Sequence, residues 1–180
     1  PRRVVEAFVG LLEPSGGRIV NISSASGPTF VSGCSAERKR QLTHAAVTLE
    51  QIDALLDECV AIDAAGESFA AAGLGDGSAY GLSKALVNAY TIALARAHPA
   101  LVVNACTPGY IETDLTRPHA ASAGKSPRQM GMKAPREGTK AQLHLLFGEV
   151  GASGWYFGSD GLRSPLDRYR APGAPPYTGD

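Results

Sequence analysis

The sequence predicts an α/β domain built on a parallel sheet. Two short runs of β-branched and apolar residues, at positions 17–22 and 101–106, are typical of buried strands. Segments with helical periodicity and turn-forming residues separate the two runs. The chain has 180 residues, of which 44% are apolar, and this is enough for one hydrophobic core. We therefore expect a single main domain.

The first strand ends in two hydroxyl side chains. Residues 4–13 have the pattern of the end of a helix, residues 15–17 form a turn, and the strand that follows leads into Ser23 and Ser24. In an open α/β sheet, ligands bind at the carboxyl ends of the strands. We therefore expect Ser24 to face a ligand.

An amphipathic helix is predicted after Thr48. Thr48 and Gln51 have the spacing of a capping box. The apolar residues that follow at helical spacing are Ile52, Leu55, Leu56, Cys59 and Val60. We expect this apolar stripe to pack on the same domain, and its alternative use is as a surface for another protein.

Tyr80 and Lys84 lie four residues apart on the next predicted helix, which Pro99 ends. Spacing of i to i+4 places both side chains on one helix face. A nearby cation favours a phenolate and so lowers the pKa of a phenol from about 10. The pair is therefore a candidate proton donor, although the same spacing also occurs where a half-buried ring lies beside a surface amine.

The second strand leads into a loop at residues 107–114 that contains proline and glycine. The composition of residues 115–134 predicts a loop with at most a short helix. This loop is either a lid or a solvated surface loop. A last helix is predicted near residues 135–147 and a strand near residues 154–157. Beyond Gly158 the chain is rich in proline and glycine, which favours extended segments over packed helices.

Three motifs in this order form a recognisable set: N-[aliphatic]-S-S at the strand end, Y-x-x-x-K on the helix, and N-A-x-x-P-G-x-x-x-T after the second strand. The set resembles the classical short-chain dehydrogenase/reductase family, from about residue 3 to residue 160. The 55 residues between Ser24 and Tyr80 resemble the helical insert of the monomeric NADPH-dependent carbonyl reductases. The extended branch of the superfamily also uses Y-x-x-x-K, but the insert and the P-G-x-x-x-T loop argue against it.

The resemblance implies a Rossmann-type doubly wound parallel sheet, of which this chain holds the C-terminal portion only. It places that portion at residues 1–160, with a helical insert at about 31–78 and a Pro/Gly-rich tail at 161–180. The glycine-rich turn that holds a dinucleotide pyrophosphate is expected to lie upstream of Pro1. The family's catalytic asparagine is expected upstream of Pro1 or at the very edge of this chain. We therefore expect the chain to be the C-terminal part of a longer protein.

The resemblance also implies an oxidoreductase that reduces an aldehyde or ketone with NADPH rather than NADH. In this interpretation Ser24 hydrogen-bonds the substrate carbonyl, Tyr80 delivers the proton, and Lys84 lowers the pKa of the phenol and holds the nicotinamide ribose. Besides Tyr80 and Lys84, the residues expected to bind the cofactor are Pro108, Gly109, Ile111, Glu112 and Thr113. A monomer is expected because the insert of such relatives covers the helices through which other members associate. The alternative is an incomplete or degenerate reductase that acts as a binding module.

Composition excludes several other classes of protein. The 17 basic and 17 acidic residues balance, so no electrostatic footprint for nucleic acid is present. No run of about 18 apolar residues predicts a membrane span. Cys34, Cys59 and Cys106 lack the spacing of a zinc site or a disulfide framework, and the four histidines lack metal-ligand spacing, so we expect no metal. Without a disulfide framework, a reducing compartment is the simpler expectation, and a cytoplasmic location is the default. Cys106 lies close to Pro108, at the edge of the expected nicotinamide pocket.

Overall fold

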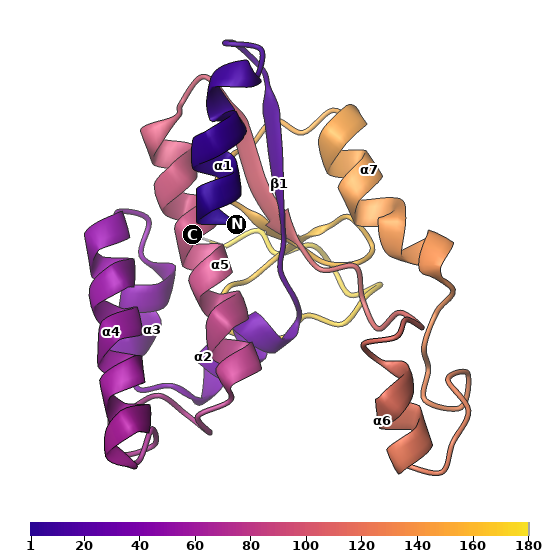
Figure 1. Cartoon of the computed structure of the whole chain (residues 1–180). Coiled ribbons are helices and arrows are strands. Elements are labelled where there is room, and N and C mark those ends of the chain that lie inside the picture. The colour runs from indigo at the N-terminus through magenta and orange to yellow at the C-terminus, as the bar shows by residue number, and fades with distance from the viewer. Residues whose placement is uncertain (180) are drawn as a thin grey trace.

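The computed structural model describes residues 1–179 and contains a four-stranded sheet in the order β1-β2-β3-β4 (Figure 1). The strands are β1 (Arg18–Ile22), β2 (Val102–Cys106), β3 (Tyr156–Phe157) and β4 (Arg163–Ser164). The first three run parallel, and β4 is antiparallel to β3. Arg18 pairs with Val102 and Ile22 with Cys106, so β1 and β2 end together. The predicted α/β fold is confirmed.

Helices cover both faces of the sheet (Figure 1). The chain forms α1 (Arg2–Phe8), the 3₁₀ turn η1 (Val9–Leu11), α2 (Ser26–Gly33), α3 (Ala36–Thr43), α4 (Leu49–Ala65), α5 (Ala79–Ala97), α6 (Arg117–Ser122), the 3₁₀ turn η2 (Pro135–Thr139) and α7 (Lys140–Phe147). On one face, Val103 packs with residues of α1 and α5. On the other, Cys106 packs with residues of α7. This division follows from the alternation of side chains along a strand.

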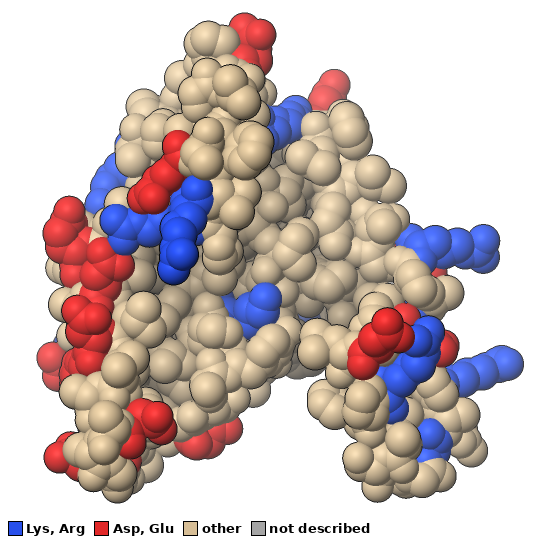
Figure 2. All heavy atoms as spheres, viewed as in Figure 1, with Lys and Arg blue, Asp and Glu red and all other residues tan. Residues whose placement is uncertain are grey.

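Helix α2 and the two helices of the expected insert, α3 and α4, pack around α5. One buried cluster joins Phe30 of α2, Leu42 of α3, Leu55 of α4 and Leu82 of α5. The capping box is present, because Thr48 Oγ1 accepts from Gln51 N at 3.3 Å and Gln51 Oε1 accepts from Thr48 N at 3.0 Å. Acidic side chains of α4 line the outer edge of the molecule in Figure 2.

The apolar stripe of α4 packs on the same domain, but it is narrower than the sequence predicts. Leu55 and Cys59 are buried, together with Ile62 one turn later. Leu56 and Val60 are 45% and 59% exposed. The reason is geometric, because α4 contacts the domain along a single line of residues and these two positions point away from it.

After residue 115, the structure contains the kinds of element that the sequence predicts, but their boundaries differ. The loop at 115–134 holds the short helix α6, and the helix expected at 135–147 is divided into η2 and α7. The sheet continues past residue 160, since β4 lies in the segment expected to be a tail. Within residues 1–179, no helix is long and apolar enough to cross a membrane.

Candidate active site

Ser24 lies just past the end of β1 and before the first turn of α2. Its Oγ donates to Ser26 Oγ at 3.3 Å and accepts from Ser26 N at 3.2 Å. The neighbouring Ser23 is 2% exposed, and its hydroxyl donates to the backbone oxygen of Lys84 at 3.2 Å. The two serines therefore differ in position, since Ser23 joins β1 to α5 while Ser24 faces a cavity.

Tyr80 and Lys84 lie on the first two turns of α5, whose start is fixed by Ser78. The Ser78 hydroxyl accepts a hydrogen bond from Gly81 N at 3.1 Å, which caps the helix. The ring of Tyr80 is exposed, and Lys84 Nζ lies 5.5 Å from its centroid. Lys84 Nζ also donates to the carbonyl oxygen of Ile22 at 3.2 Å. The ammonium therefore connects the Tyr80 phenol with the carboxyl end of β1.

A close contact between α2 and α5 fixes the position of Ser24 relative to Lys84. A Cβ atom at Gly27 would lie 3.0 Å from the backbone carbon of Lys84 and 3.1 Å from Ala85 N. Only glycine allows the two backbones to approach this closely. The start of α2, with Ser26 and the preceding Ser24, is thereby held against the Lys84 turn.

The loop after β2 starts with a tight turn. Thr107 Oγ1 accepts from Gly109 N at 3.1 Å, and Gly109 has a φ of +91°. A Cβ there would lie 3.0 Å from the Cβ of Ser159. Glycine is therefore required at this position both by the backbone conformation and by the segment that follows β3. Pro108, beside it, is half-buried.

Further along the loop, the side chains of Ile111, Glu112 and Thr113 are used within the loop region itself. Ile111 is buried, and a Cβ added to Gly138 would lie 2.9 Å from it. The carboxylate of Glu112 accepts from Arg117 at 3.2 Å. The hydroxyl of Thr113 lies 3.3 Å from that of Thr116. A cofactor beside this loop would therefore meet mainly its backbone.

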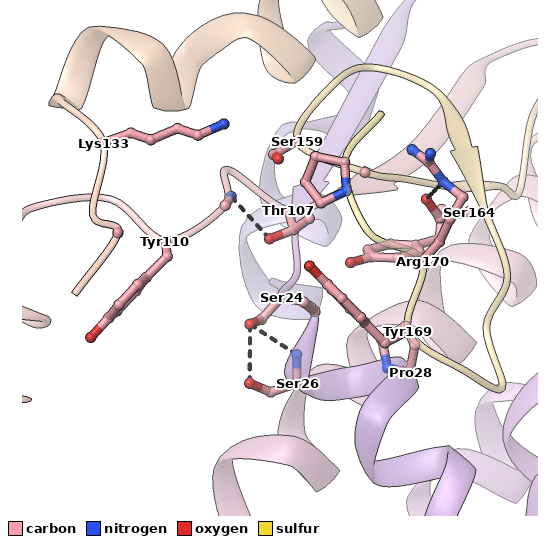
Figure 3. A pocket seen from close by; sticks show the side chains of 16 residues that line it. Ser24, Ser26, Pro28, Thr107, Tyr110, Lys133, Ser159, Ser164, Tyr169 and Arg170 are labelled. Carbon is pink, nitrogen blue, oxygen red and sulfur yellow. Dashed lines mark hydrogen bonds between the residues drawn. The ribbon is translucent and has the colours of Figure 1, made fainter. Parts of the chain in front are cut away.

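A cavity of about 350 Å³ opens at the carboxyl ends of the strands. Figure 3 shows Tyr110 on one side of Ser24 and Tyr169 on the other, with the Lys133 side chain extending towards Ser159. Among the predicted site residues, the lining includes Ser24 and Gly109. Tyr80 and Lys84 lie outside this lining, on the α5 side of β1.

Comparison with known proteins identifies the family. Over 159 residues the chain is 30% identical to short-chain dehydrogenase/reductase 1 of Saponaria officinalis, covering 87% of this chain and 48% of that protein. It is 27% identical over 157 residues to carbonyl reductase [NADPH] 1 of Rattus norvegicus, covering 84% of this chain and 52% of the relative. Salutaridine reductase of Papaver somniferum has the same fold, with a TM-score of 0.67 and 27% identity over 86% of this chain and 50% of that structure.

The chain belongs to the short-chain dehydrogenase/reductase family. The resemblance predicted from the sequence is confirmed, as is the Rossmann-type fold. No protein-family model matches the chain. The chain spans about half the length of these curated relatives, at 48% and 52%.

Several cavity residues of this short-chain dehydrogenase/reductase chain were not predicted from the sequence. They are Tyr110, Lys133, Ser159, Tyr169, Arg170 and Pro172. Half of these come from beyond residue 160, a segment whose composition indicated only extended structure. Tyr110 lies within the P-G-x-x-x-T motif. No spacing in the sequence marks the other residues, because contacts between distant segments bring them to the cavity.

Asp160 holds this last segment in place. Its Oδ1 accepts from Arg170 Nη2 at 2.5 Å and from Leu162 N at 3.2 Å, and its Oδ2 accepts from Gly173 N at 2.9 Å. Burial acts to raise the pKa of Asp160, but these hydrogen bonds outweigh it and lower the pKa to about 2. We call these four residues the Asp160 clasp. The clasp positions Tyr169 and Pro172 at the cavity.

The three cysteines have no reactive character. Cys34, Cys59 and Cys106 are all buried and free. Burial raises the pKa of Cys106 to about 12, so the thiol keeps its proton at neutral pH. Within residues 1–179, no group of three or more His, Cys, Asp or Glu side chains is arranged to hold a metal ion.

Proposed function

We propose that the protein reduces an aldehyde or ketone by hydride transfer from NADPH. The position of the Lys84 ammonium supports this most directly. It donates a hydrogen bond to the backbone oxygen of Ile22, at the end of β1 beside Ser24, and lies 5.5 Å from the centroid of the Tyr80 ring. Two similar proteins are named for such activity, carbonyl reductase [NADPH] 1 and salutaridine reductase. The choice of NADPH over NADH rests on the first of these names.

The residues present fit a nicotinamide cofactor. An ammonium has three N–H donors, and one hydrogen bond from Lys84 goes to Ile22, so donors are left for ribose hydroxyls. In the loop at 108–113 the side chains of Ile111, Glu112 and Thr113 are used within the loop region, which leaves the backbone there for a planar amide. When bound, the cofactor supplies the hydride, and the chain supplies orientation and the proton.

Ser24 and Tyr80 have distinct roles in this proposal. The Ser24 hydroxyl donates to Ser26 over 3.3 Å, a long hydrogen bond that a substrate carbonyl oxygen could replace. The exposed Tyr80 phenol donates the proton to the same oxygen, with the Lys84 charge beside the ring. The cavity lined by Ser24, Tyr110 and Tyr169 would then hold the organic part of the substrate.

The test is the oxidation of NADPH with a panel of aldehydes, quinones and ketones. Both the 180-residue chain and the same chain preceded by a glycine-rich nucleotide-binding segment are assayed, because this chain spans about half of its relatives. Tyr80→Phe removes the proton donor and keeps the ring, so turnover should fall by about 10²-fold or more. Tyr90→Phe, a buried position on the same helix, is the matched control and should retain activity.

Substantial turnover in Tyr80→Phe would overturn the role of this residue. If neither form of the folded protein binds NADPH, the reductase proposal fails and the result favours the alternative, a binding module. That result is distinguished from misfolding by circular dichroism and by a cooperative thermal transition.

The packing of the insert region supports a monomer. Leu55 and Cys59 of α4 share a core cluster with Leu82 and Ala85 of α5, and α2 lies directly against α5. These helices therefore bury much of the α5 surface within one chain. Light scattering coupled to size-exclusion chromatography should give the mass of one chain, and a dimer mass at micromolar concentration would contradict the proposal.

A further inference from the structure

We propose a second ligand site, for a phosphomonoester, in the cleft between the C-terminal end of α5 and the strands β3 and β4. The cleft has a volume of about 790 Å³, which lies within the range of small-molecule sites. Its lining shares only Tyr156 and Ser164 with the cavity that contains Ser24. The catalytic proposal uses neither this cleft nor the residues that give it charge.

Arg163 is the central cation of the cleft. Its guanidinium carbon lies over the Trp155 ring at 3.9 Å from the centroid, and 5.0 Å from the centroid of Tyr177. A guanidinium held on aromatic faces keeps the N–H donors at its edge. Within residues 1–179, Arg163 forms no ion pair with a carboxylate. Its position therefore suits the recognition of an oxyanion.

Arg96 adds a second fixed positive charge. It donates to the backbone oxygen of Ala45 at 2.9 Å and to that of Val47 at 2.7 Å. Carbonyl groups are neutral, so these hydrogen bonds orient the guanidinium without cancelling its charge. The field of Arg96 is therefore available to an anion in the cleft.

The balance of charge in the cleft favours a dianion. Arg40, exposed on α3, also lines the cleft and has no carboxylate partner among the residues that the structure describes. Asp167 is the only acidic residue among the described lining residues, and it accepts from Arg168 at 3.0 Å. Three arginines thus face the cleft against one carboxylate that is already paired. A phosphomonoester, with close to two negative charges, matches this better than a monoanion.

Part of the remaining wall of the cleft is apolar, beside the polar side chains of Thr43, His44 and Ser153. The apolar part includes Ile92, Leu166 and Trp155, which is 37% exposed. An apolar or aromatic group attached to the phosphate would cover these side chains while the phosphate meets the arginines. The ligand class is therefore an aryl or alkyl phosphomonoester rather than inorganic phosphate alone.

The single tryptophan of the chain allows a direct test. Because Trp155 is the only tryptophan, its fluorescence reports this cleft and no other site. We titrate the chain with phenyl phosphate, with inorganic phosphate and with benzyl alcohol. We expect a saturable change with phenyl phosphate at a Kd at least tenfold below that of the other two probes, and binding that weakens as salt is added.

Two variants and one control decide the outcome. Arg40→Gln changes an exposed residue and should raise the Kd for phenyl phosphate about tenfold, as expected for one lost charge-assisted hydrogen bond. Arg163→Gln should raise the Kd further, with thermal unfolding used to verify that the tail remains packed. Arg3→Gln, an exposed arginine on α1, should leave the Kd unchanged. Equal affinity for phenyl phosphate and benzyl alcohol, or a Kd unaffected by both cleft variants, would overturn the proposal.

Discussion

Lys84 Nζ donates a hydrogen bond to the backbone oxygen of Ile22 at 3.2 Å, which joins α5 to the last residue of β1. A second bond runs in the opposite direction, from the hydroxyl of Ser23 to the backbone oxygen of Lys84. These two bonds bring the serine and tyrosine–lysine motifs together across 60 residues of sequence. The lysine is thus a structural connection as well as a charge beside Tyr80.

Lys84→Met tests this connection. Methionine keeps an apolar stem but removes the ammonium, so we expect weaker NADPH binding and a fall in kcat/KM of about 10²-fold. The assay is carbonyl-dependent NADPH oxidation, with NADPH affinity measured separately. Lys125→Met, at an exposed position beyond α6, should leave both quantities unchanged. Unchanged NADPH affinity in Lys84→Met would rule out the ribose contact.

Gly27→Ala tests the close approach of α2 to α5. The added Cβ would lie 3.0 to 3.1 Å from the backbone of Lys84 and Ala85, so the two helices must separate. We expect a loss of about 1–3 kcal/mol in the free energy of unfolding, measured with urea. Gly33→Ala on the same helix is the matched control, because its Cβ meets only Gly75 at 3.7 Å. Equal stability of the two variants would contradict the tight contact.

The sequence predicted the motif positions well because they depend on local rules. Strand ends place Ser24, and a spacing of four residues places Lys84 beside Tyr80. It did not predict helix α2, whose sequence SGPTFVSG contains poor helix formers. That helix exists because Phe30 and Val31 are buried in the cluster around α5, and such tertiary packing cannot be inferred from local propensity.

The sequence also did not predict that residues beyond 160 line the Ser24 cavity, because this too depends on tertiary contacts. Tyr169 reaches the cavity because the Asp160 clasp closes a loop in a segment rich in proline and glycine. A pair of opposite charges ten residues apart has no periodic signature. Only the folded structure shows that Asp160 and Arg170 are 15% and 7% exposed and face each other.

Cys106 should resist chemical modification in the native protein. The thiol has no exposed surface, and burial raises its pKa to about 12, so both access and thiolate are lacking at pH 8. Incubation with iodoacetamide followed by intact-mass measurement should show no adduct in buffer and three adducts in urea, one for each cysteine. Peptide mapping that finds modified Cys106 in native protein would show that the β2 end opens readily.

Asp160 should make the free energy of unfolding depend on pH in the acid range. The pKa of its carboxyl is lowered from 3.8 to about 2 in the folded chain, so the folded state holds the proton less tightly than the unfolded state. The stabilisation is therefore complete above about pH 4 and is lost as the pH falls through about 2. A shift of this size corresponds to about 2 kcal/mol.

Asp160→Asn removes this contribution at neutral pH. The amide keeps one acceptor oxygen but loses the charge and the second acceptor, so the ion pair with Arg170 is lost and Gly173 N is left without its partner. Urea unfolding at pH 7 should show a loss of about 2 kcal/mol, and the variant should lose less stability than the original chain between pH 4 and pH 2. Asp57→Asn, an exposed carboxylate on α4, should leave both the stability and its acid dependence unchanged. If Asp160→Asn and Asp57→Asn behave alike, the clasp does not hold the tail against the cavity, and Tyr169 must be positioned by other contacts.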